Sequence, residues 1–214
     1  MSNNQITILR SGFSLFLFVI LVGCAAGIHS PSVKTNVPSE RLAKNTYGSP
    51  DGGYTVALPP LIKPGARIEE RQISPETHGV FFMDDFGKVY CILRNDNTNI
   101  KITIEEASDN FHGGDILREK QYTTTERGKE LRILGINKNG SPVVTRSKEN
   151  GEWVERKNDL YEAWSLFANG DHLYQVAAGV TALQKESENI LFDRAKRNLE
   201  EFLKSLIIKP TNQK

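Results

Sequence analysis

The sequence has few cysteines and almost no net charge. Only two of its 214 residues are cysteines, and the formal net charge is +1. No basic stripe or tail accompanies this balance, so the chain lacks the electrostatic footprint of a nucleic-acid-binding protein. If Cys24 serves as an anchor, as argued below, Cys91 has no partner within the chain. The fold must then rest on an apolar core instead of a disulfide.

Catalytic signatures are also missing. The sequence contains no glycine-flanked serine elbow, no zinc-binding helix motif and no signature of a cysteine nucleophile. Asp85-Phe86-Gly87 spells a kinase magnesium motif, but the other kinase motifs are absent, so we interpret it as a hairpin turn. Cys91, flanked by Tyr90 and Ile92, is predicted to be a packed thiol in a strand. We therefore expect no enzymatic activity and no cofactor.

Long apolar runs are scarce, and the most prominent one lies near the N-terminus. The segment from Phe13 to Val22, about ten residues, is too short to cross a bilayer as a helix, so residues 1–23 are predicted to be a signal peptide. Leu21-Val22-Gly23-Cys24 resembles the lipobox of bacterial lipoproteins. That resemblance implies cleavage before Cys24 and attachment of a diacylglyceryl group to its thiol. The alternatives are a cysteine that merely ends a signal peptide and an uncleaved amphipathic anchor.

The lipobox resemblance also implies a location. Acyl chains on Cys24 would hold the protein on a membrane outside the cytoplasm, in the cell envelope. In a Gram-negative cell, Ala25 after the cysteine resembles the sorting signal for the periplasmic face of the outer membrane. Residues 24–214 contain 26 basic and 26 acidic residues, because residues 1–23 include Arg10 and no acid. A neutral chain has little overall electrostatic attraction to anionic lipid headgroups.

Residues 24–52 are predicted to form a flexible tether that begins with the lipidated Cys24. Their composition is rich in Ser, Pro, Asn, Lys and Thr and shows no sustained apolar period, so they cannot bury enough surface to offset the entropy of ordering. A flexible chain of this length holds a domain about 25 to 30 Å from its anchor. Residues 53–208 are predicted to form a single globular domain, followed by a tail at 209–214.

Short apolar or alternating segments predict an antiparallel sheet in this domain. The predicted strands are Tyr54–Leu58 ending at Pro59, Gly79–Met83, Lys88–Leu93, Ile100–Glu105, Leu131–Ile136, Val143–Thr145 and Glu152–Arg156. Asn139-Gly140 predicts a tight hairpin turn between the fifth and sixth of these strands. The polar stretch from Asp115 to Glu126 is compatible with either a short helix or an ordered loop.

The clearest hairpin lies in the C-terminal half. Leu160–Ala168 and Asp171–Thr181 flank Asn169-Gly170, a pair that favours tight turns. Pairing Ala168 with Asp171 places apolar side chains on both faces of the two strands. We therefore predict a central strand pair that is covered on both sides.

A long amphipathic helix is predicted from Ser187, as N-cap, to Leu206. Its apolar positions recur at helical spacing: Leu191, Ala195, Leu199, Phe202, Leu203 and Leu206. The order of elements from 53 to 208 resembles the PsbP-like fold, through the strand that ends at Pro59, the long hairpin and the closing helix. The resemblance implies an α+β domain with an antiparallel sheet covered by helices, an α/β/α sandwich. It also implies accessory or assembly roles without catalysis.

One segment gathers groups that could bind a ligand. Asp109-Asn110-Phe111-His112-Gly113-Gly114-Asp115 combines a histidine, carboxylates and glycines, which a metal or a phosphate can use. No sequence argument brings His78 or His172 to this segment, so we favour a surface loop and predict no metal site.

These observations favour a non-catalytic binding or assembly module of the bacterial envelope. Its expected partners are the membrane, through lipid on Cys24, and an envelope protein. A carrier of an apolar small ligand is the main alternative, because a cavity between sheet and helix cannot be read from sequence. An envelope hydrolase is the least favoured of the three, since no nucleophile and base are recognisable.

Overall fold

The computed structural model describes residues 37–61, 66–84, 86–96, 104–105, 115–182 and 186–209. The predicted signal peptide, Cys24 and most of the 109–115 loop lie outside these residues, and so does the tail beyond Lys209. Within the described residues, no helix is long and apolar enough to cross a membrane.

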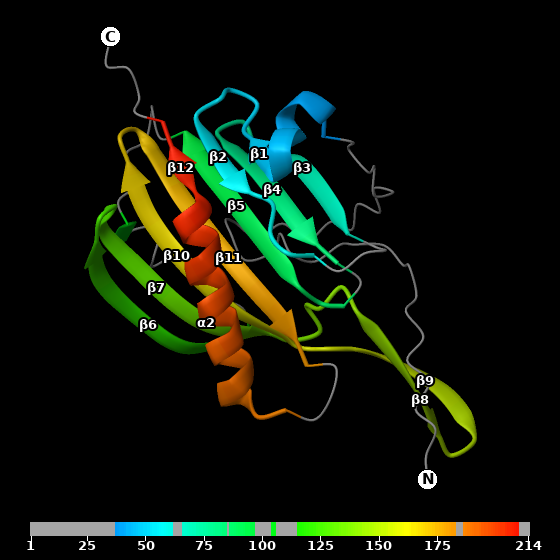
Figure 1. Ribbon diagram of the computed structural model, residues 1–214. Helices are drawn as coiled ribbons and strands as arrows, with labels where there is room; N and C mark the ends of the chain where they lie inside the picture. The colour runs from blue at the N-terminus through cyan, green and yellow to red at the C-terminus, as the bar shows by residue number, and fades with distance from the viewer. Residues whose placement is uncertain are drawn as a thin grey trace.

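A seven-stranded antiparallel sheet forms the frame of the molecule (Figure 1). Its strand order is β3-β4-β5-β11-β10-β7-β6, so the C-terminal hairpin β10–β11 lies at the centre. The strands are β3 (Arg67–Ser74), β4 (Thr77–Met83), β5 (Val89–Asp96), β6 (Ile116–Thr125), β7 (Gly128–Asn137), β10 (Leu160–Asn169) and β11 (His172–Thr181). Most residues of the central pair are buried, as predicted from the apolar side chains on both of its faces.

The register of the central hairpin differs from the prediction by two residues. Asn169 pairs with His172, and Ala168 with Leu173 rather than Asp171. Gly170, at φ 59°, occupies the first central position of the turn, which is where a type II′ turn places glycine. A shift of two residues leaves each side chain on its predicted face, because side chains alternate along a strand.

Helix α2 (Glu188–Ser205) packs across β10 and β11 on one face of the sheet (Figure 1). The predicted helix is confirmed, although Ser187 makes no side-chain capping hydrogen bond. Its buried residues are Leu191, Phe192, Ala195, Leu199, Phe202 and Leu203. Apolar burial on this face supplies most of the drive for docking the helix. Among the described residues only this one long helix covers the sheet, so the predicted sandwich with helices on both faces is corrected.

The opposite face of the sheet also carries a buried apolar cluster. Phe81, Cys91, Leu131 and Trp164 all belong to it, and so does Ile104. Ile104 and Glu105 are the two described residues of the predicted strand 100–105, and both are helical. The strand prediction is therefore wrong for these two residues.

The end of the predicted tether is ordered, which corrects the boundary at residue 52. Residues Ser39–Asn45 form a 3-10 helix (η1), and β1 (Thr46–Gly48) pairs with β2 (Tyr54–Ala57). Strand β12 (Ile207–Ile208), which follows α2, pairs with the other edge of β2. Tyr47 and Val37 are buried in the core. The apolar residues of this segment are isolated and follow no period, so the sequence did not predict that they belong to the core.

Two further predictions fail in the middle of the chain. The polar stretch Asp115–Glu126, predicted as helix or loop, contains the ten-residue edge strand β6. Asn139-Gly140 does make a turn, with Asn139 at φ 55°, but β7 pairs with β6 and β10 and not with the strand that follows the turn. That strand, β8 (Val144–Glu149), pairs with β9 (Glu152–Lys157) in a separate two-stranded sheet.

Candidate functional site

The predicted candidate residues do not form a common site in the described structure. Cys91 is buried, and desolvation raises the pKa of its thiol, so it is not a ready nucleophile. Of the 109–115 segment only Asp115 is described. Its carboxylate accepts the backbone N–H of Lys138 at 2.5 Å, which fixes the turn after β7. Cys24 and His112 lie outside the described residues.

A cluster of charged and aromatic groups surrounds Arg94 at one end of the sheet. The guanidinium of Arg94, on β5, donates to Asp51 at 2.5 Å and lies 3.0 Å from Asp96. His172 of β11 places Nδ1 3.0 Å from the same Asp96. Burial raises the pKa of Asp51, but the Gly53 N–H, Ser49 and Arg94 together lower it to about 2.

A second group of polar side chains lies beside the Arg94 cluster, on the same face. Glu70 of β3 accepts hydrogen bonds from the Tyr47 hydroxyl at 2.5 Å and from Arg41 at 2.6 Å. His78 faces Arg94 across β4 and β5, and burial lowers the pKa of its imidazole. No local sequence pattern predicts this convergence, because the residues come from seven separate elements.

The arrangement of these groups suits a structural role. Arg94 is 7% exposed and its charge is balanced by the two aspartates, so it ties the β1–β2 turn to the sheet. Within the described residues no group of three or more His, Cys, Asp or Glu side chains could hold a metal ion. A nucleophile aligned with a general base is not found among the hydrogen bonds of this cluster.

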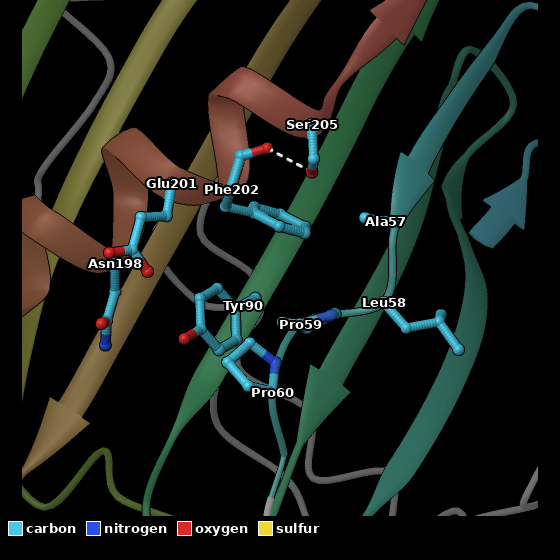
Figure 2. Close-up of a pocket in the computed structure, with 9 residues that line it drawn as sticks. All are labelled: Ala57, Leu58, Pro59, Pro60, Tyr90, Asn198, Glu201, Phe202 and Ser205. Atoms are coloured by element: carbon cyan, nitrogen blue, oxygen red, sulfur yellow. Dashed lines mark hydrogen bonds between the residues drawn. The ribbon is translucent and has the colours of Figure 1, made fainter. Parts of the chain in front are cut away.

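A small cavity of about 110 Å³ lies between the C-terminal half of α2 and the end of β2 (Figure 2). The rings of Tyr90 and Phe202, with centroids 5.1 Å apart, line the cavity together with Pro59 and Pro60. Asn198 and Glu201 approach it from the helix. A cavity of this size holds a group no larger than a single amino-acid side chain, well below the usual few hundred Å³ of a ligand pocket.

Glu162 is a carboxylate buried within the central strand β10. It lies on the face opposite α2, and its neighbours in register are Gly135 on β7 and Gly179 on β11. Desolvation raises its pKa to about 8, although the Trp164 indole lowers it. One carboxylate oxygen, Oε1, has no hydrogen-bond partner in the described structure. The Glu162 carboxyl is therefore largely protonated at neutral pH. Its burial affects the stability of the fold.

Three of the seven exposed large apolar side chains in the described structure lie on strand β6, and one lies on the β8–β9 hairpin. Strand β6, at the edge of the large sheet, exposes Ile116, Leu117 and Tyr122, and its side chains are exposed on both faces over most of its length. The β8–β9 hairpin projects away from the body of the molecule (Figure 1) and exposes Trp153. An exposed sheet edge and an exposed aromatic residue are features of interaction surfaces.

The comparisons with known proteins yield only fold-level similarity. No protein-family model and no curated protein matches the sequence. Among solved structures, a mutant of the protein Mog1 is 12% identical, with a TM-score of 0.45, covering 78% of this chain and 96% of that one. The Ran-binding protein Mog1p of Saccharomyces cerevisiae is 11% identical, with a TM-score of 0.44 and coverages of 77% and 95%.

A third similar structure, from Bacteroides thetaiotaomicron, is 8% identical with a TM-score of 0.39, covering 79% of this chain and 50% of that one. At these identities and TM-scores the likeness concerns the arrangement of the chain alone, and no function follows from it. The described architecture is a mostly antiparallel sheet with one C-terminal helix packed on it.

Proposed function

We propose that this chain is a lipoprotein of the bacterial envelope, anchored through Cys24, that acts as a non-catalytic module binding another envelope protein. The edge strand β6 is the observation that carries the proposal. Among the described residues it lies at the end of the strand order and pairs with β7 alone, so within that part of the chain its other side leaves backbone N–H and C=O groups without a strand partner. An extended segment of a partner can add to such an edge as a further strand.

The two edges of the sheet differ in a way that favours β6 as the binding edge. Strand β3, at the other edge, is mostly half-buried, and Arg41 of η1 pairs with its Glu70, whereas most residues of β6 are exposed. Strand β6 has a register shift between Leu117 and Glu119, but its pairing with β7 is continuous from there to Thr125. A regular, exposed edge of this length is a template for strand addition.

The side chains of β6 add an apolar contribution to the backbone template. Leu117 and Tyr122 oppose Gly135 and Leu131 of β7, so both project from the face opposite α2. An added strand would bury part of both side chains. Each Å² of apolar surface removed from water would favour binding by about 25 cal/mol. The small cavity beside Tyr90 gives less support to the alternative of a carrier for an apolar ligand.

Crosslinking in cells tests this function. We expect the native protein to capture a defined envelope protein, and Leu117→Lys to weaken that capture about tenfold, because a charge at the interface must be desolvated. Ile190→Lys is the matched control: Ile190, on α2, is 53% exposed and Leu117 is 52% exposed. Cys24→Ser tests the anchor separately, by loss of the lipid from the mass of the protein and loss of membrane fractionation.

Two results would overturn the proposal. If both lysine variants capture the same partner as the native protein, β6 is not the binding edge. If no protein is captured and a small molecule co-purifies instead, the carrier alternative replaces the module.

A further inference from the structure

The β8–β9 hairpin, called the arm below, is firmly attached at its base. The hydroxyls of Ser141 and Thr181 share a hydrogen bond of 2.7 Å, which links the start of the arm to β11. Asn158 donates to the carbonyl of Val143 at 3.2 Å and closes the base from the other strand. Beyond this base, β8 and β9 pair with each other and with no other strand that the structure describes. An isolated two-stranded hairpin has little stability of its own, so the base holds the arm in its projecting direction.

One face of the arm combines an aromatic residue with positive charge. Register places Lys148 opposite Trp153 and Arg146 opposite Glu155, and Lys157 lies on the same face because it is four residues from Trp153. Arg146 and Glu155 form an ion pair. Neither Lys148 nor Lys157 forms an ion pair with a residue that the structure describes, so this face carries two uncompensated charges. The chain is neutral as a whole, but this face is not.

The surroundings of Trp153 discriminate between two kinds of binding partner. Trp153 is 56% exposed, and its neighbours on this face are charged. Charged residues are depleted from the cores of protein–protein interfaces, where an aromatic anchor is surrounded by apolar contacts. At a membrane surface, by contrast, tryptophan rings occupy the headgroup region and lysines are attracted to anionic lipids.

We propose that the arm is a membrane-contacting element that inserts Trp153 into the headgroup region of an anionic lipid surface, with Lys148 and Lys157 facing the lipid phosphates. This inference rests on the proposed function only for the anchor at Cys24, which keeps the arm at a high local concentration near lipid. Two lysines supply only weak attraction to an anionic surface, so the contact is weak without the anchor. The lipid contact would orient the domain and leave β6 available for its partner.

Fluorescence quenching by brominated lipid tests the contact. The full-length lipidated protein is reconstituted into vesicles of equal parts phosphatidylcholine and phosphatidylglycerol, and separately into phosphatidylcholine alone. The tryptophan emission comes from Trp153 and Trp164 alone, and Trp164 is 3% exposed in the core. We expect brominated acyl chains to quench part of the emission on anionic vesicles, and Trp153→Ala to abolish that quenched part. The double variant Lys148→Glu, Lys157→Glu should reduce the quenched part about tenfold.

Controls separate the arm from the anchor and from β6. Ile207→Ala removes another exposed apolar side chain, 64% exposed, and should leave quenching unchanged. Leu117→Lys should also leave it unchanged, so failure of partner binding and failure of lipid contact are distinguishable. Unquenched Trp153 in vesicle-anchored protein, or quenching insensitive to the two lysine reversals, would overturn the proposal. Loss of a crosslinked protein in Trp153→Ala, without any lipid quenching, would make the arm a protein-binding element instead.

Discussion

The molecule contains two hairpins that turn at an Asn-Gly pair, and they differ in almost every other respect. In β10–β11 Gly170 alone has a positive φ, of 59°, and the strands are buried on both faces in the middle of the sheet. In β8–β9 Asn150 and Gly151 both have positive φ, 49° and 92°, and the strands project into solvent. The third pair, Asn139-Gly140, turns the chain without joining two paired strands.

The two hairpins show that an Asn-Gly pair predicts where the chain reverses direction. It does not predict whether the flanking strands are buried. Apolar residues on both faces place β10–β11 in the core, since each face buries against a separate apolar cluster. The arm has charged residues on both faces and one exposed tryptophan, so it cannot bury either face.

The largest expected effect comes from the buried hairpin. Phe167 is fully buried, stacks on Tyr174 with ring centroids 5.5 Å apart, and lies under the Arg127 guanidinium. Phe167→Ala should lower the free energy of unfolding by about 3 to 5 kcal/mol, because it leaves a cavity. Urea denaturation measures this, and Phe167→Leu should retain most of the stability. A loss below about 1 kcal/mol would show that the hairpin is less tightly packed than described.

The next largest effect is expected at Glu162 of the same hairpin, on the pH dependence of the protein's stability. Glu162 has an ordinary pKa of 4.5 unfolded and about 8 folded, so unfolding releases a proton between these values. Stability should therefore fall as pH rises through that window, by up to about 1.4 kcal/mol per pH unit, and level off above it. Glu162→Gln should remove this slope, and so be most stabilising, relative to the native protein, near pH 8. Parallel stability curves for the two proteins from pH 5 to 8 would contradict the burial of the Glu162 carboxyl.

A smaller effect is expected at the turn of the arm. Gly151 has φ 92° and open space around its Cα, so Gly151→Ala adds backbone strain of about 1 kcal/mol without a steric clash. Amide hydrogen exchange in β8 and β9 should accelerate about fivefold, while exchange in β10 and β11 is unchanged. Asn150→Gly is the control, since glycine tolerates the same positive φ. Acceleration in both hairpins would mean that the arm supports the core.

The smallest effect on stability is expected for the exposed aromatic residue. Trp153→Ala should change the free energy of unfolding by less than about 0.5 kcal/mol, because the side chain is mostly in solvent already. The same substitution should abolish the lipid-quenched emission described above. A stability loss comparable to that of Phe167→Ala would show that Trp153 packs against the domain instead.

Sequence reasoning was most reliable where burial has a clear period. The apolar spacing from Leu191 to Leu203 defined α2, and the alternation and length of the segment from Leu160 to Thr181 defined the central hairpin. Strand β2 and the β4–β5 hairpin were also predicted correctly. In each case one or both faces of the element are buried, so the pattern of side chains records the contact.

The predictions that failed concern residues whose burial follows no clear period. Strand β6 is exposed on both faces over most of its length, so it has no alternation to read, and its candidate role as a binding edge follows only from its place in the sheet. Tyr47 contributes to the core from a polar segment, through contacts with Tyr54 and Phe82 that are distant in sequence. The Arg94 cluster likewise assembles from β5, β11 and the β1–β2 turn, which no local spacing links.

The three-stranded sheet β1-β2-β12 has a consequence for the order of folding. Its middle strand is near the start of the described chain and its outer strand β12 near the end, and the Lys209 N–H donates to the Gly53 carbonyl at 2.9 Å. Contacts between such distant residues slow folding, because the long loop between them must close first. A chain that emerges N-terminus first cannot complete this sheet until its last strand is delivered. Strand β2, which pairs with β1 on one side and with β12 on the other, therefore acquires its second strand partner last.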